Sequence, residues 1–368
     1  MNQTIHWTEH GQSMQAMWGG DSRHPAPTQI QTISQISAEQ ALQQMRQNIA
    51  LLWRGDYHQG KQLLAAIKKR VHSKARTHND FHKHRLQQAQ HSRLFQQLLI
   101  EIQPDGQISN NRAPNVAGAI TDVYGSPNHT NLLLPLHLLL GYIGAHEWHK
   151  TGVRIPALNG QKIYVPYGVF SPVRGEYLQL VAEAHLPEPC HSAWDIGTGS
   201  GVLAAILAQR GIAHITATDN NPRAIACAQA NIQRLGLAGQ IHIQHTSLFP
   251  DGRADLIICN PPWLPAKASS DIETALYDPA HHMLQSFLSH ALNHLNSNGQ
   301  VWLIMSDIAE HLGLRSSEAL PQWIQSAGLK VIHKTDIQPT HPKAHQHHHP
   351  LANARNREIT SLWQLSAQ

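Results

Sequence analysis

The second half of this 368-residue chain predicts an α/β fold built on a mainly parallel sheet. From Ser192 onward, short apolar runs alternate with segments of helical period, as in parallel sheets covered by helices on both faces. Several predicted strands end in glycines or polar residues, at the sheet edge where such folds bind ligands. The chain length favours two domains.

The predicted elements of this half follow in a regular order. A helical segment through Ala184 precedes the strand 192–197. After it we expect helices near 200–210, 222–235 and 280–295, and strands near 212–218, 240–245, 256–259, 300–306, 329–335 and 358–364.

The first third predicts a mostly helical accessory region. Residues 1–30 are polar, and we expect them to be poorly ordered. A capping pattern from Ser37 to Gln40 begins a helical run that ends at Arg54-Gly55, and further helices are expected near 60–76 and 83–102. The expected division is therefore an accessory domain over 1–130, connecting strands and turns over 131–170, and the α/β domain over 171–368.

Composition favours a cytoplasmic protein. The net charge is +4 and 41% of the residues are hydrophobic, which suits a globular chain with a real core. Cys190, Cys227 and Cys259 lie in apolar runs, which predicts reduced thiols and no disulfide. No apolar leader begins the sequence, and the run 132–145 is too short to cross a membrane.

The strand 192–197 leads into a glycine loop, D-I-G-T-G-S-G, from Asp195 to Gly201. Glycines permit a tight turn and close approach of a ligand to a helix N-terminus. Asp219 follows the next strand, where a carboxylate can accept both hydroxyls of a ribose. The G-x-G-x-G spacing differs from that of pyrophosphate-binding folds and indicates a nucleoside ligand without a diphosphate. A plain turn, with Asp219 or Asn221 capping a helix, is the alternative.

The sequence N-P-P-W, from Asn260 to Trp263, follows the fourth predicted strand. Proline restrains the residue before it to extended conformations, so Asn260 and Pro261 form a stiff corner that presents an amide oxygen and a backbone carbonyl. Two such acceptors suit a planar NH2 group, and Trp263 offers a flat face for stacking. The pattern predicts an active site for a conjugated amine, whereas a loop with a core tryptophan is the structural alternative.

Motifs, order and spacing over about 165–368 resemble class I S-adenosylmethionine-dependent N-methyltransferases of the "methyltransferase small" group. The resemblance implies a Rossmann-like seven-stranded sheet whose last strand is antiparallel, and S-adenosyl-L-methionine as cofactor. It assigns catalysis to Asn260, Pro261, Pro262 and Trp263. It assigns cofactor binding to Asp195, Gly197, Thr198, Gly199, Gly201, Asp219, Asn220, Ser247 and Asn260, and no metal.

The cues for the acceptor disagree. The family's acidic residue after its third strand is replaced here by Thr246-Ser247-Leu248. The stretch 168–176 is similar to that of rRNA guanine methyltransferases, whereas Leu264-Pro265 after the tryptophan is closer to the protein-glutamine enzymes. We favour a protein glutamine side chain, on a translation factor or ribosomal protein, because Leu264-Pro265 adjoins the acceptor; an rRNA, tRNA or DNA base is the alternative.

Two further segments bear on partners. Residues 61–93 hold nine Lys or Arg against one acid, Asp80, which predicts docking on RNA phosphates or else a solvated helical surface. The stretch 341–349 holds five histidines between the last two strands; we expect a flexible acceptor-side loop rather than a metal site.

Two other classes of function compete with N-methyl transfer. A nicotinamide dehydrogenase is disfavoured by the glycine spacing and by the N-P-P-W corner. A non-catalytic nucleic-acid-binding module is disfavoured because the residues of that corner are all present.

Overall fold

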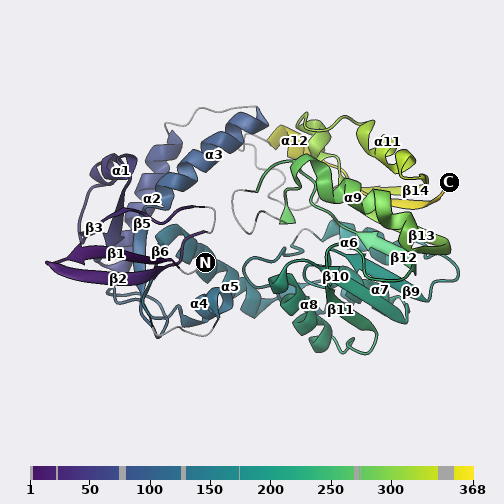
Figure 1. Ribbon diagram of the computed structural model, residues 1–368, viewed down its shortest axis with the longest axis horizontal. Helices are drawn as coiled ribbons and strands as arrows, with labels where there is room; N and C mark the ends of the chain where they lie inside the picture. Colours follow the sequence, from purple (N-terminus) through teal and green to yellow (C-terminus); the bar gives the residue numbers. More distant parts are fainter. Residues whose placement is uncertain are drawn as a thin grey trace. The chain divides into compact units, whose positions relative to one another are not determined.

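The computed structural model describes residues 3–21, 24–73, 80–125, 130–173, 175–268, 273, 275–338 and 352–368 (Figure 1). Contacts divide the chain into two compact units, the first holding residues 1–147 and the second 148–268 and 272–368. Helix α5, Leu136–Thr151, belongs to both. The boundary between the two units thus lies inside the segment 131–170, which the sequence assigns to connecting strands and turns.

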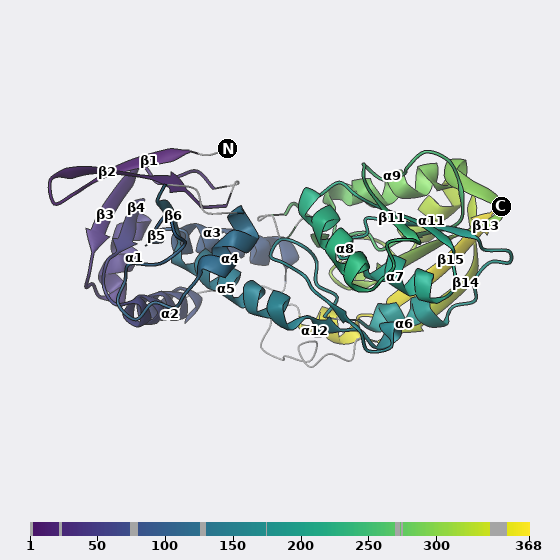
Figure 2. The same ribbon diagram turned by 90° about the horizontal axis from the view of Figure 1, so that it is seen from below.

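The first unit is built on a six-stranded mixed sheet in the order β1-β2-β6-β5-β4-β3 (Figure 2). Its strands are β1 Thr4–Glu9, β2 Gln12–Trp18, β3 Gln29–Ile33, β4 Ile49–Trp53, β5 Leu98–Ile102 and β6 Leu132–Pro135. Its helices are α1 Ala38–Arg46, α2 Tyr57–Ser73, α3 Phe81–Phe95 and α4 Ala117–Tyr124, together with α5. Strands β3, β4 and β5 run parallel to one another.

The prediction of a mostly helical first region is wrong. The apolar runs that form β4 and β5 look like helix ends in the sequence, because five buried residues carry no period that separates strand from helix. The prediction of disorder over 1–30 is also wrong, since β1 and β2 pair antiparallel and bury Ile5 and Trp7. The predicted capping box of α1 at Ser37 is confirmed.

The second unit contains the predicted seven-stranded sheet, in the order β11-β10-β9-β12-β13-β15-β14. Its strands are β9 Ser192–Ile196, β10 His214–Asp219, β11 Ile241–His245, β12 Ala254–Cys259, β13 Leu295–Ser306, β14 Leu329–Ile337 and β15 Thr360–Ala367. The last strand, β15, is antiparallel to both of its neighbours, as predicted. A short hairpin of β7 Val153–Arg154 and β8 Lys162–Ile163 precedes this sheet.

Helices cover both faces of the second sheet (Figure 1). One apolar cluster joins the sheet to α6 Glu176–Glu183, α7 Val202–Gln209 and α8 Pro222–Arg234. The other joins it to α9 His282–Ala291 and α11 Ala319–Ser326. Two short helices, α10 Ile308–His311 and α12 Ala352–Arg357, lie beside the ends of β13 and β15.

The three cysteines are free thiols, as the sequence predicts. Within the described ranges, every helix is too short or too polar to span a lipid bilayer.

Candidate active site

Three adjacent parallel strands, β10, β9 and β12, carry the predicted site residues other than Ser247 at their carboxyl ends. The glycine loop follows β9, Asp219 ends β10, and Asn260 follows β12. In the sheet register Cys259 lies opposite Ile196, so Asn260 and Gly197 leave their strands side by side. The fold therefore brings the predicted cofactor loop and the predicted catalytic corner to one edge.

The glycine loop has the backbone that its sequence requires. Gly197, Gly199 and Gly201 have φ angles of +73°, +56° and +81°, which L-residues rarely adopt. A Cβ at Gly201 would meet Ala228 at 3.3 Å, so this glycine permits close packing of the loop on α8. A Cβ at Gly199 would meet nothing within 4 Å. The loop is therefore open on the side of Gly199, which suits a bound ligand.

Asp195 is a fully buried carboxylate with unequal oxygens. Its Oδ2 accepts hydrogen bonds from the Thr198 hydroxyl at 2.6 Å and from the Ala204 N–H at 3.1 Å. Its Oδ1 is buried and has no hydrogen-bond partner among the described residues. Burial raises the pKa of Asp195 to about 6, against the lowering effect of these two hydrogen bonds. An unpartnered buried oxygen of this kind suits a cationic ligand group.

Asp219 ties the loop to β10. Its Oδ2 accepts from the Gly199 N–H at 2.9 Å, and its Oδ1 accepts from the Asn221 N–H at 2.8 Å. Burial raises the pKa of this carboxyl, while the same hydrogen bonds lower it. Asn221, not Asp219, caps α8, through its bond from the Arg223 N–H at 3.0 Å. Each Asp219 oxygen keeps a further lone pair for a ligand hydroxyl.

Two other predicted cofactor residues lie beside Asp219. Asn220 and Ser247 are exposed and follow the ends of β10 and β11. The Thr246 N–H donates to the Asp219 carbonyl at 3.1 Å, which joins the two segments. Their contact with a cofactor stays a prediction.

The N-P-P-W corner is a compact, partly buried turn. The indole N–H of Trp263 donates to Asn260 Oδ1 at 3.0 Å. The Trp263 ring is half-buried and packs against the apolar clusters on both faces of the sheet. Within the part of the chain that the structure describes, the Pro261 carbonyl accepts no hydrogen bond. The tryptophan thus has a core role, and the corner still offers the Pro261 carbonyl and a second lone pair on Asn260.

Sequence reasoning missed two residues of this site. Tyr177 lies on α6 and is 4% exposed, and burial and the nearby Asp195 raise the pKa of its hydroxyl. Asp278 accepts hydrogen bonds from the N–H groups of Met283 and Leu284, both at 3.0 Å, at the start of α9. The Met283 methyl group would lie 3.3 Å from a Cβ at Gly197, so α9 borders the glycine loop. Neither residue belongs to a recognisable sequence motif. Tyr177, for example, looks in the sequence like one more apolar position of a helix.

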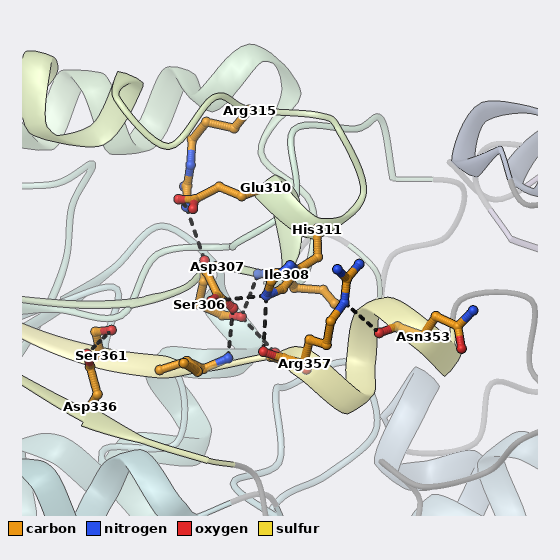
Figure 3. Close-up of polar contacts among 12 residues, drawn as sticks. Ser306, Asp307, Ile308, Glu310, His311, Arg315, Asp336, Asn353, Arg357 and Ser361 are labelled. Carbon is orange, nitrogen blue, oxygen red and sulfur yellow. Dashed lines mark hydrogen bonds and ion pairs between the residues drawn. The ribbon is translucent and has the colours of Figure 1, made fainter.

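The next strand end along the sheet is closed by a polar network (Figure 3). The Ser306 hydroxyl donates to Glu358 Oε1 at 2.8 Å, and the Ile359 N–H donates to Asp307 Oδ1 at 2.7 Å. His311 Nε2 lies 3.1 Å from Asp307 Oδ2 and 3.0 Å from the Arg357 carbonyl. These bonds hold α12 at the carboxyl end of β13. The histidine-rich stretch 341–349 that precedes α12 lies outside the described residues.

Comparison with known proteins finds similar sequences for part of this unit. Residues 162–324 match the family model "Methyltransferase small domain". The release factor glutamine methyltransferase of Cereibacter sphaeroides is 32% identical over 167 residues, which are 41% of this chain and 56% of that protein. The ribosomal RNA small subunit methyltransferase C of Haemophilus ducreyi is 34% identical over 111 residues, 30% of this chain and 31% of that protein.

Among solved structures, the chain is similar to the ribosomal protein L11 methylase of Lactobacillus delbrueckii subsp. bulgaricus. It has a TM-score of 0.40 and 20% identity, and the match covers 57% of this chain and 86% of that one. The chain spans only about half the length of the release factor enzyme and a third of the rRNA enzyme.

Proposed function

We propose that the chain is an S-adenosylmethionine-dependent methyltransferase that methylates a planar amide or exocyclic amine nitrogen, and the match of residues 162–324 to the model "Methyltransferase small domain" supports this. One observation carries this proposal: the Asn260–Pro261 corner leaves the sheet beside the glycine loop, in register with it. A cofactor in the loop and an amine at the corner would therefore be neighbours. Holding the amine nitrogen next to the methyl group would compensate for its weak nucleophilicity.

The cofactor edge has groups that suit S-adenosylmethionine. The unpartnered Asp195 Oδ1 fits the ammonium of its methionine end, and the open side of Gly199 leaves room for close backbone approach. The remaining lone pairs of Asp219 fit the ribose hydroxyls. When bound, this cofactor supplies an electrophilic methyl group.

The chain's own residues would bind and orient the acceptor. Asn260 Oδ1 and the Pro261 carbonyl accept the two N–H bonds of the target nitrogen and favour the pyramidal geometry that develops as it attacks. The exposed part of Trp263 covers the planar group. No strong general base is required, because the alkylated nitrogen is acidic and loses its proton to water.

For the acceptor we favour a protein glutamine side chain, on the strength of Leu264-Pro265 after the tryptophan. A direct test incubates the protein and its Asn260→Ala variant with cell extract and S-adenosylmethionine labelled in the methyl group. Label that protease releases and RNase leaves intact supports a protein acceptor, and the reverse supports RNA. If the wild-type protein labels nothing beyond the Asn260→Ala background, the proposal fails.

An RNA acceptor is the second candidate, and the surface of α2 and α3 favours it. Five cations there are exposed and make no ion pair with a carboxylate among the described residues; they are Lys61, Lys69, Arg70, Lys83 and Arg93. Lys74 and Arg76, also in the predicted basic stretch, lie outside the described residues. Unneutralised cations attract phosphates by releasing counterions.

Paired substitution tests this surface. Lys69→Gln with Arg70→Gln should weaken binding to total ribosomal RNA and reduce its dependence on salt, by about one unit of the log–log slope for each phosphate that is no longer neutralised. Lys330→Gln, which removes an exposed lysine from β14, is the matched control. Equal binding and equal salt slopes for all variants would mean that α2 and α3 present an ordinary solvated face.

A further inference from the structure

A buried asparagine on α8, Asn231, holds the glycine loop through its side-chain amide. The residue is 1% exposed. Its Nδ2 donates to the Ser200 carbonyl of the glycine loop at 3.0 Å and to the Tyr164 carbonyl at 3.0 Å. Its Oδ1 accepts from the Tyr164 N–H at 2.9 Å. One side chain thus joins α8, the glycine loop and the chain that follows β8.

The partners of Asn231 fix the direction of its amide. A backbone N–H only donates and a carbonyl only accepts, so the amide oxygen must face the Tyr164 N–H and the NH2 group must face the two carbonyls. The N–H and the carbonyl of Tyr164 are both engaged, as they are when two antiparallel strands pair. Cys227, one turn earlier on α8, donates its thiol to the same carbonyl at 3.4 Å. Tyr164 is therefore fixed to α8 by its backbone.

The glycine loop needs such a hold more than an ordinary turn does. Its three glycines have φ angles from +56° to +81°, and glycine loses more backbone freedom than any other residue when its conformation is fixed. Ser200 lies between Gly199 and Gly201, so a bond to its carbonyl restrains the peptide that joins it to Gly201. A loop that is ordered in advance has less entropy to lose when a ligand binds.

Other bonds that restrain the loop come from groups that the proposed cofactor would also bind. Asp219 accepts from the Gly199 N–H, and Asp195 accepts from the Thr198 hydroxyl. Both carboxylates would gain a further partner on cofactor binding. Asn231 differs from them, because both ends of its buried amide are engaged by backbone groups. Its hold on the loop is therefore the same with and without a ligand.

We propose that Asn231 is a positioning residue, which keeps the glycine loop in its cofactor-binding conformation by holding the Ser200 carbonyl against the backbone of Tyr164. This inference rests on the proposed function and extends it, because it assigns a role in cofactor binding to a residue of α8 outside both motifs. Loss of the amide should weaken cofactor binding through the loop alone, with Asp195 and Asp219 unchanged.

Calorimetry with the demethylated product of S-adenosylmethionine measures this role. Asn231→Ala should raise the dissociation constant about 3- to 10-fold, the scale of one lost hydrogen bond. Asn296→Ala is the matched control, because the Asn296 amide donates to Asp255 Oδ1 at 2.8 Å near the amino ends of the strands of the same sheet. It should leave the dissociation constant within about twofold. An unchanged constant in Asn231→Ala, or equal weakening by the two variants, would overturn the proposal.

Amide hydrogen exchange tests the geometry without any ligand. In Asn231→Ala the N–H groups of Tyr164, Gly199 and Gly201 should exchange about 3- to 10-fold faster than in the wild-type protein, because the loop and its anchor lose a shared partner. In Asn296→Ala these three groups should exchange at the wild-type rate. Unchanged exchange in the loop, or equal acceleration throughout the second unit, would mean that Asn231 does not order the loop.

A second variant separates the two ends of the amide. At pH 8 the carboxylate of Asn231→Asp still accepts from the Tyr164 N–H but cannot donate to the Ser200 carbonyl. The Tyr164 N–H should therefore keep its slow exchange while the loop amides exchange faster, and protected loop amides in this variant would contradict the proposal. If the wild-type protein binds neither S-adenosylmethionine nor its product, the proposed function fails, and loop exchange still decides whether Asn231 orders the loop.

Discussion

The two sheets of this protein end their parallel strands in opposite ways. In the first unit Arg54 follows β4 and forms ion pairs with Glu9, at 2.6 Å, and with Glu101. Asn131 completes the cluster by donating to the other Glu101 oxygen at 2.6 Å. In the second unit Asp195, near the end of β9, keeps a buried oxygen with no partner among the described residues.

This difference distinguishes an edge with a structural role, in the first unit, from a candidate binding site, in the second. Polar groups at the first edge satisfy one another, so their charges are used within the fold. At the second edge the Asp195 oxygen, the open side of Gly199 and the Pro261 carbonyl leave hydrogen-bonding capacity for a ligand. Unused capacity in a buried place, more than the presence of polar residues, marks the site.

The largest expected effect lies at the paired edge. Arg54→Met should lower the free energy of unfolding by about 3–5 kcal/mol, because it leaves the buried Glu101 and the largely buried Glu9 without a counterion. Denaturant unfolding measures this loss. Arg112→Met, which breaks the pair of the solvent-exposed Arg112 with Asp56, is the control and should cost much less. Similar losses for the two variants would mean that the first edge is not a buried, self-satisfied cluster.

The next effect concerns turnover at the open edge. Asn260→Ala should reduce methyl transfer about a hundredfold or more and leave cofactor affinity unchanged, because its bond strengthens as the acceptor nitrogen becomes positive. Asn260→Asp should be milder, since a carboxylate still accepts. Trp263→Ala should instead raise the acceptor KM. Single-turnover experiments measure the rates of methyl transfer. A near-normal rate in Asn260→Ala would mean that the N-P-P-W corner has only a structural role.

A smaller effect follows from the raised pKa of Asp195. Because the folded pKa of about 6 exceeds the unfolded value of about 3.9, this carboxyl stabilises the ligand-free protein most below pH 4, and that stability is lost as the pH rises through 6. A ligand ammonium requires the carboxylate, so cofactor affinity should fall at most about tenfold per pH unit below 6. Calorimetry from pH 5 to 8 measures this slope. The same slope in Asp195→Asn would assign the titration to another group.

How far the sequence predicts the molecule also differs between the two units. In the second unit, turns and glycines bound each strand, and the strand ends fall within a few residues of those expected. In the first unit the runs 49–53 and 98–102 are uniformly apolar, so nothing local separates a buried strand from a helix. Ile5 and Trp7 in β1 do alternate with exposed residues, a strand signal that the polar composition of 1–30 obscured.

Motifs predict the site only where function depends on consecutive residues. The glycine loop and the N-P-P-W corner are local, and the structure brings them together. The ion pair of Arg54 with Glu9 joins residues 45 positions apart. Such pairs depend on how the chain folds back on itself, so no reading of neighbouring residues reveals them.

Calorimetric titration with S-adenosylmethionine tests most directly that the open edge of the second sheet is a cofactor site. The wild-type protein should bind S-adenosylmethionine and its demethylated product, and Asp219→Ala should weaken both by roughly 1–3 kcal/mol, the scale of hydrogen bonds to a charged group. Arg54→Met, measured where the protein remains folded, should bind as the wild type does. Binding of NAD with no response to S-adenosylmethionine would contradict the assignment.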